Sequence, residues 1–91
     1  MTIWYTLYTR QEPPCSYCIE AKELLKVYGK DFYEVDISEP GVKEMFAERG
    51  FRTVPQVFKE DRHIGGCSAL RQELEYEQQE EERKHRARTK E

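Results

Sequence analysis

The chain has 91 residues, of which 37% are hydrophobic and 36% charged, and its formal net charge at pH 7 is −3. This length suits one small domain. The balanced charge gives no argument for nucleic acid as the main partner, and no apolar run approaches the roughly 20 residues of a membrane helix. The first residues lack the basic flank and apolar core of a signal peptide, and three cysteines do not suit a secreted disulfide framework. We therefore expect a cytoplasmic protein.

The first strand and the first helix are predicted from a change in hydrophobic period. Aromatic and β-branched residues alternate through positions 3–8 with a period of two, which predicts a strand. Pro13 and Pro14 favour a turn, because neither has an N–H to give to a ladder or to a helix interior. Helical spacing follows from Cys18, and Gly29 is a typical helix stop. The apolar positions of this helix are Ala21, Leu24, Leu25 and Tyr28.

A second strand and a second helix follow in the middle of the chain. Residues 31–37 alternate again and predict a strand. We expect Ser38 to cap the next helix, with Pro40 in its first turn, because proline is tolerated there. Gly50 is expected to end this helix.

A hairpin and a last helix complete the predicted elements. Residues 53–58 form an extended run with a proline near its start, and His63 and Ile64 begin a short fourth strand. The polar turn between these runs is short, so we expect them to pair as an antiparallel hairpin. From Ser68 onward the apolar residues have helical spacing.

The order of elements is β-α-β-α-β-β-α, which predicts an α/β fold: a four-stranded mixed sheet with three helices against it. The first two strands are joined through a helix, so they should be parallel with a right-handed crossover. We expect residues 1–75 to form this domain and residues 76–91 to form a charged C-terminal helical extension or a disordered tail. In that tail, acids at 80–82 precede bases at 83–88, as helical i,i+4 pairing prefers. A basic contact patch for a partner is the alternative.

Two cysteines, Cys15 and Cys18, stand where the first strand turns into the first helix. A cysteine at the start of a helix faces unpaired backbone N–H groups and the positive end of the helix dipole, which favours thiolate over thiol. The second cysteine, one helical turn further on, lies close enough to form a small disulfide. Such a pair can accept and pass on two electrons, so the spacing predicts a redox-active dithiol.

Three separated segments resemble the glutaredoxin family. They are Cys15-Ser16-Tyr17-Cys18, Thr53-Val54-Pro55-Gln56-Val57-Phe58 and Ile64-Gly65-Gly66-Cys67-Ser68. The resemblance covers about residues 2–74 and implies a thioredoxin-like fold, which agrees with the order of elements. It also implies an enzyme, a glutathione-disulfide oxidoreductase with Cys15 as nucleophile and Cys18 as resolving thiol. The attacking thiol should then be exposed and of low pKa.

The resemblance further implies a glutathione site beside Cys15. Pro55 would be a cis-proline that faces the dithiol and aims the backbone groups of Val54 at the extended peptide of glutathione. The turn Gly66-Cys67-Ser68 would bind the γ-glutamyl carboxylate at the start of the last helix. We expect the Cys67 side chain itself to be small and buried or facing the ligand. The remaining glutathione-binding candidates are Arg10, Tyr17, Arg52 and Thr53.

Departures from the family pattern leave other functions open. Ser16 stands where many members have proline, and some relatives with serine hold a [2Fe–2S] cluster between two subunits. The alternative function is therefore an iron–sulfur carrier or sensor with Cys15 as cluster ligand, and we expect a monomer unless that cluster is bound. Ala69 stands where many members have an aspartate that meets the ammonium group of glutathione. A zinc site of Cys15, Cys18 and Cys67 is a third hypothesis, although it lacks a convincing fourth ligand.

The protein substrate is predicted only by class. Disulfide-containing proteins and glutathione mixed disulfides are the expected substrates of such a dithiol. Gly50-Phe51-Arg52 resembles the glutaredoxin-like electron donors to ribonucleotide reductase, which thioredoxin reductase reduces. Ribonucleotide reductase is therefore one candidate partner, and either glutathione or thioredoxin reductase is the source of electrons.

Overall fold

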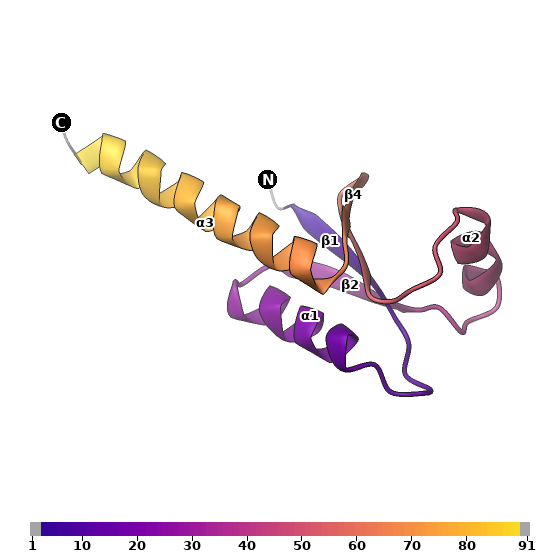
Figure 1. Cartoon of the computed structure of the whole chain (residues 1–91). Helices are drawn as coiled ribbons and strands as arrows, with labels where there is room; N and C mark the ends of the chain where they lie inside the picture. Colours follow the sequence, from indigo (N-terminus) through magenta and orange to yellow (C-terminus); the bar gives the residue numbers. More distant parts are fainter. Residues whose placement is uncertain (1–2, 90–91) are drawn as a thin grey trace.

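The computed structural model describes residues 3–89, and the side chains of residues 3–83. Its elements follow the predicted order (Figure 1). They are β1 (Trp4–Thr9), α1 (Ser16–Val27), β2 (Asp31–Asp36), α2 (Val42–Glu48), β3 (Gln56–Lys59), β4 (Arg62–Gly65) and α3 (Cys67–Thr89). The predicted class, a four-stranded mixed sheet with three helices, is confirmed.

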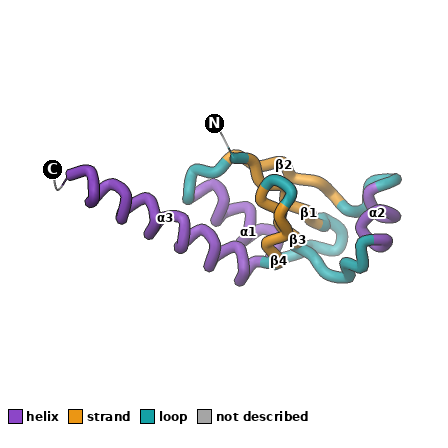
Figure 2. The backbone as a smooth tube through the Cα atoms, turned by 90° about the horizontal axis from the view of Figure 1, so that it is seen from above, coloured by secondary structure: helices purple, strands orange, loops and turns teal. Residues whose placement is uncertain are grey.

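The strands lie in the order β2-β1-β3-β4. β1 and β2 are parallel, with Trp4 opposite Asp31, and α1 makes the crossover between them. β3 pairs antiparallel with both β1 and β4, so the predicted hairpin is also confirmed. Figure 2 shows α2 beyond the end of the sheet where β1 and β2 finish, which is the end from which the chain enters α1.

One face of the sheet carries the hydrophobic core. Tyr5 and Leu7 alternate along β1 and are fully buried against α1 and α3, which lie side by side on this face (Figure 2). The core cluster consists of Tyr5, Leu7, Ala21, Leu25, Val57, Cys67, Leu70 and Leu74. Burying a leucine side chain contributes about 1.5–3 kcal/mol, so this packing holds the middle of α1 and the first two turns of α3 on the sheet.

The opposite face carries an outer aromatic cluster of Tyr8, Phe46, Phe51, Phe58 and His63. Phe46 of α2 lies 5.9 Å from Tyr8 and 5.2 Å from Phe51, between ring centroids. Phe51 and Phe58 lie 4.9 Å and 5.0 Å from the His63 ring. Aromatic pairs in this range of separation attract one another beyond simple area burial. The cluster therefore holds α2 and the chain that leads into β3 against the sheet.

Charged side chains tie α3 to the far end of the sheet. Glu77 accepts a hydrogen bond of 2.7 Å from the Tyr5 hydroxyl, pairs with Lys59, and lies 3.1 Å from the Lys30 ammonium. Lys59 also pairs with Glu73 at 3.2 Å. Burial raises the pKa of Glu77, but the hydrogen bonds from Lys59, Tyr5 and Lys30 outweigh burial and hold this pKa below its ordinary value. The cluster thus stabilises the docked part of α3 when Glu77 is ionised.

Two element boundaries differ from the prediction. Ser38 does not cap α2: its N–H and its hydroxyl both donate to the Asp36 carboxylate, at 2.9 and 2.8 Å. This local turn uses the capping group, and α2 begins only after Gly41, whose N–H donates to Glu44. Pro40 therefore lies before the helix. β3 begins at Gln56, so residues 53–55 form an approach to the strand rather than its first part.

α3 continues without a break past residue 75 and ends at Thr89. The division of the chain at residue 75 stays a prediction. Arg83 pairs with Glu80 at 3.3 Å, one helical turn apart, as the order of acids and bases indicates. The other bases of the predicted contact patch, at positions 84–88, lie outside the described side chains. Within residues 3–89, every helix is too short or too polar to cross a membrane.

Candidate active site

Cys15 is the N-cap of α1, as the sequence predicts. It has extended backbone angles, and its sulfur accepts a hydrogen bond of 3.2 Å from the N–H of Cys18. The sulfur thus occupies the place of an oxygen in an ordinary N-cap, at the positive end of the helix dipole. In the reduced protein, this N–H and this dipole would stabilise a thiolate on Cys15.

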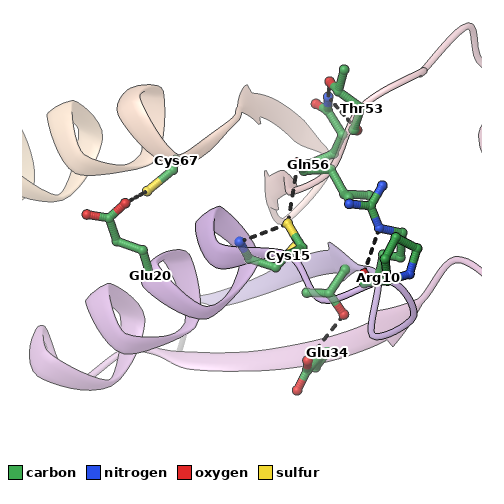
Figure 3. Close-up of a disulfide and its surroundings, with 11 residues drawn as sticks. Arg10, Cys15, Glu20, Glu34, Thr53, Gln56 and Cys67 are labelled. Carbon is green, nitrogen blue, oxygen red and sulfur yellow. Dashed lines mark hydrogen bonds between the residues drawn. A yellow bond between two sulfur atoms is a disulfide. The ribbon is translucent and has the colours of Figure 1, made fainter.

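Cys15 and Cys18 form a disulfide, with their Cα atoms 5.2 Å apart (Figure 3). Cys18 lies in the first turn of α1 and is 3% exposed, whereas Cys15 is 8% exposed. The expectation of an openly exposed nucleophile is therefore wrong for the oxidised state, although Cys15 is the more accessible of the two. The assignment of Cys15 as nucleophile and Cys18 as resolving thiol stays a prediction.

The loop before β3 faces the dithiol. The carbonyl oxygen of Val54 lies 3.8 Å from the Cys15 sulfur. The Val54–Pro55 peptide bond is cis, as the resemblance implies. A Cβ added at Gly66 would lie 3.7 Å from the carbonyl oxygen of Pro55, so the start of α3 passes close behind this loop. The structure thus brings together Cys15, Val54, Pro55 and Gly66, which are far apart in the sequence.

The other predicted glutathione contacts lie around this centre. Arg10 folds back on its own loop, where its Nε donates to the Pro13 carbonyl at 3.0 Å (Figure 3). Tyr17 is 65% exposed beside Cys15 in the first turn of α1. Arg52 and Thr53 are exposed in the approach to β3. Arg10 also borders both cysteines on the surface.

Cys67 is buried, and its thiol points away from the dithiol toward α1. Its S–H donates to the Glu20 carboxylate at 3.3 Å, and the same carboxylate pairs with Arg71 at 2.7 Å. Burial, together with the Glu20 carboxylate, raises the pKa of the Cys67 thiol. The side chain therefore fills the α1–α3 interface, which confirms that it is small and buried. Any contact of this residue with a ligand would use its backbone.

A groove of about 270 Å³ borders both cysteines on a part of the surface that Val54 and Gly66 do not line. In it, the Glu34 carboxylate accepts a hydrogen bond from Thr9 at 3.2 Å and pairs with Lys22 at 2.9 Å. The sequence gives little indication of this charge pair, because Glu34 is one polar residue in an alternating strand and Lys22 is one of several charges on α1.

The proposed zinc site does not form. Cys15 and Cys18 are joined to each other, and the Cys67 sulfur is bonded to Glu20 instead. Among the side chains of residues 3–83, no three histidine, cysteine or acidic residues gather as metal ligands.

Comparisons with known proteins agree with this geometry. The family model described as Glutaredoxin matches residues 5–64. The chain is 42% identical over 66 residues to Glutaredoxin 3 of Escherichia coli (strain K12), which covers 70% of this chain and 77% of that protein. The solution structure of glutaredoxin from Brucella melitensis superimposes with a TM-score of 0.63 and 41% identity, over 84% of this chain and 82% of that one. The crystal structure of a buckwheat glutaredoxin–glutathione complex gives a TM-score of 0.60 at 25% identity, over 74% and 64% of the two chains.

The family match covers more than half of the chain and contains both cysteines of the disulfide. The solved relatives share the thioredoxin-like arrangement of a mixed sheet and three helices, which confirms the predicted fold. Glutaredoxins use glutathione and act on disulfides. The chain belongs to the glutaredoxin family, and its Cys15/Cys18 pair makes it a thiol–disulfide oxidoreductase.

Proposed function

We propose that this protein reduces protein disulfides and glutathione mixed disulfides with glutathione as the electron donor. One observation carries the proposal: the Cys15 sulfur caps α1 and lies 3.8 Å from the Val54 carbonyl. The first contact activates the sulfur as a nucleophile. The second places the Val54 backbone beside it, where an extended peptide such as glutathione can add as a strand does.

In the monothiol route, the Cys15 thiolate attacks the glutathione sulfur of a mixed disulfide. The protein thiolate leaves and takes up a proton, and Cys15 then carries glutathione. A second glutathione, as thiolate, attacks this sulfur and releases glutathione disulfide and the Cys15 thiolate. Each step breaks one S–S bond and forms one, so the net reaction converts the mixed disulfide and one free glutathione into the protein thiol and glutathione disulfide.

In the dithiol route, Cys15 attacks a substrate disulfide and forms a mixed disulfide with one substrate sulfur. Cys18, as thiolate, then attacks the Cys15 sulfur, which releases the second substrate thiol and closes the Cys15–Cys18 disulfide seen in the structure. Two glutathiones restore the dithiol. Cys18 suits this role, because its Cα lies only 5.2 Å from that of Cys15 in the same helical turn.

The glutathione would lie between the Val54 loop and the start of α3. Backbone groups of Val54 and the cis-Pro55 loop would pair with its peptide, and the N-terminus of α3 at Gly66, Cys67 and Ser68 would take its γ-glutamyl carboxylate. The side chains proposed to flank it are Arg10, Tyr17, Arg52 and Thr53. The proximity of Gly66 to Pro55 supports this arrangement, because it brings the Val54 loop and the start of α3 together.

The decisive experiment follows the reduction of a glutathionylated peptide, with glutathione, glutathione reductase and NADPH. We expect Cys15→Ser to lower kcat/KM by about 10³ or more, because serine is not a nucleophile at neutral pH. Cys18→Ser should retain reduction of the mixed disulfide and lose reduction of an intramolecular protein disulfide. Full activity in Cys15→Ser would refute the proposed roles.

We propose that the protein works as a cytoplasmic monomer with glutathione, and that ribonucleotide reductase is one candidate substrate.

The physiological reductant is tested by changing the source of electrons in the assay. The wild-type disulfide is offered either glutathione or thioredoxin reductase with NADPH. Faster reduction by thioredoxin reductase would overturn glutathione as donor and favour the class of donor that the segment 50–52 resembles.

The alternative function is a [2Fe–2S] carrier or sensor with Cys15 as ligand. Ser16 supports it, because it occupies the first position of α1, next to the nucleophile. The described side chains of this chain supply no set of three metal ligands, so glutathione and a second subunit would have to complete the site. Anaerobic reconstitution with iron, sulfide and glutathione should then give a coloured dimer. A colourless monomer would exclude this alternative.

A further inference from the structure

A hydrogen-bonded chain runs from the outer aromatic cluster to the loop beside the dithiol. The Nε2 of His63 lies 2.7 Å from the Oε1 of Gln56. The Nε2 of Gln56 then donates to both the carbonyl oxygen and the Oγ1 of Thr53, at 3.1 and 3.2 Å. Thr53 immediately precedes Val54, whose carbonyl lies 3.8 Å from the Cys15 sulfur. Figure 3 shows Gln56 and Thr53 together above Cys15.

The direction of this chain follows from its partners. The carbonyl oxygen of Thr53 can only accept, so the NH₂ group of Gln56 must face it and the amide oxygen must face His63. An amide oxygen can only accept as well, so the Nε2 of His63 carries a proton and donates. The orientation of the Gln56 amide is therefore determined by one donor on one side and one acceptor on the other.

Burial restrains Gln56, and aromatic contacts restrain His63. Gln56 is 9% exposed, so its amide has little access to water as an alternative partner. His63 is exposed on β4, but its ring contacts both Phe51 and Phe58, with centroid distances of 4.9 and 5.0 Å. A buried amide that loses a partner bears the full cost of desolvation, which makes the paired orientation strongly preferred.

We propose that His63 and Gln56 are positioning residues that hold the Thr53–Val54 backbone in the orientation in which it receives a peptide beside Cys15. The substrate class this concerns is a disulfide attached to an extended peptide, glutathione included. The inference rests on the proposed function for its effect on turnover. The two hydrogen bonds from Gln56 restrain Thr53 at two atoms, so their loss frees the residue that immediately precedes Val54.

Two variants remove different hydrogen bonds of this series and keep the size of the substituted side chain similar. Gln56→Glu keeps an acceptor for His63 but removes both donors to Thr53. His63→Phe keeps an aromatic ring in contact with Phe51 and Phe58 but removes the donor to Gln56. Arg62→Gln is the matched control in the same hairpin. It removes the ion pair between the exposed Arg62 and Glu73 and leaves the hydrogen bonds of His63, Gln56 and Thr53 in place.

The kinetic test compares substrates with and without a peptide. For the glutathionylated peptide, we expect KM to rise roughly five- to tenfold in Gln56→Glu and His63→Phe, with kcat within about twofold of wild type, because a lost hydrogen bond weakens binding by this order. Bis(2-hydroxyethyl) disulfide, reduced by dithiothreitol, offers no peptide to bind. On this substrate, the turnover rates of Gln56→Glu and His63→Phe should equal those of wild type and Arg62→Gln. Unchanged KM for the peptide, or an equal loss on both substrates, would overturn the positioning role.

A second measurement is independent of glutathione turnover. Backbone ¹⁵N order parameters of Val54 in the oxidised protein should fall in Gln56→Glu and in His63→Phe, and remain at the wild-type value in Arg62→Gln. If the wild type does not use glutathione, the proposed function fails, while these order parameters still decide the inference. Wild-type values in both variants would refute it.

Discussion

Gly65 is the position where the geometry makes the sharpest prediction about stability. It joins β4 to α3 with a φ of +128°, a conformation that residues with a side chain rarely adopt. A Cβ added there would lie 3.0 Å from the Cβ of Ala69. Ala69 has no flexible end that could move aside, and it precedes the fully buried Leu70 in α3. Gly65→Ala must therefore strain the turn or displace the start of the helix.

The cost of Gly65→Ala has two parts. The disfavoured backbone conformation costs about 1–3 kcal/mol, and the forced contact adds on the order of 1 kcal/mol. Together we expect about 2–4 kcal/mol. For a domain of this size each kcal/mol lowers the melting temperature by roughly 4–8 °C, so a fall of about 8 °C or more should result. This is a large fraction of the roughly 5–15 kcal/mol that stabilises a typical domain.

The assay is urea unfolding of the oxidised protein, followed by far-ultraviolet circular dichroism. Gly66→Ala is the matched control, because its Cβ would meet nothing closer than the Pro55 carbonyl at 3.7 Å, an ordinary contact. Adding Gly65→Ala to Ala69→Gly separates the two parts, since the contact is then absent and only the strained φ is added. Because glycine itself weakens the helix, the double variant is compared with Ala69→Gly alone, and the difference should be smaller than that between Gly65→Ala and wild type by about 1 kcal/mol. A midpoint for Gly65→Ala equal to that of Gly66→Ala would refute the reasoning.

Three further predictions concern charge and binding. Glu77→Gln should lower the free energy of unfolding by about 1–3 kcal/mol at pH 7, because it removes the anion that Lys59 pairs with. Since the pKa of Glu77 lies below its ordinary value of 4.5, this stability is present above pH 4.5 and is lost as the pH falls through the folded pKa, so urea midpoints of the two proteins should converge in acid. Glu20→Gln should speed alkylation of Cys67 by iodoacetamide at pH 8 in a protein whose dithiol is oxidised, because a neutral amide no longer raises the thiol pKa; an unchanged rate would mean that burial alone controls it. Ala69→Asp should lower the KM for glutathione by roughly three- to tenfold, and an unchanged KM would place the glutathione ammonium elsewhere.

The parts of the fold that the sequence predicted depend on contacts close in the chain. The alternation in residues 3–8 and 31–37 and the short turn of the hairpin are local patterns, and all of them formed as expected. Of the two boundaries that differ from the prediction, the start of α2 is also local in origin. Ser38 has the chemistry of a helix cap, but the Asp36 carboxylate two residues earlier takes both of its donors. Two turn chemistries competed for one serine, and propensity alone does not rank them.

In the active site too, the residues fixed by local spacing could be predicted, and those that depend on strand register could not. Cys15 at the N-cap and Cys18 one turn later are fixed by a spacing of three residues, so the sequence predicts them directly. The hydrogen bond between Gln56 and His63 depends on hairpin register: Phe58 is paired with His63, and Gln56 lies two residues before Phe58 on the same face. A β-bulge between Val57 and Phe58 shifts that register, so the strand pattern alone would not place the two side chains together.

This difference has a consequence for how the enzyme can vary. The nucleophile depends on one helical turn, whereas the backbone that receives the peptide depends on a loop held by Gln56 and His63, side chains that do not touch the dithiol. Substitutions in the hairpin should therefore change which peptides bind while leaving the reactivity of Cys15 unaltered. Substitutions in the first turn of α1 should do the reverse. A hairpin variant can thus keep its activity on a small disulfide after it has lost its preference among peptides. The comparison of the two substrates proposed for Gln56→Glu measures whether these two properties are separable.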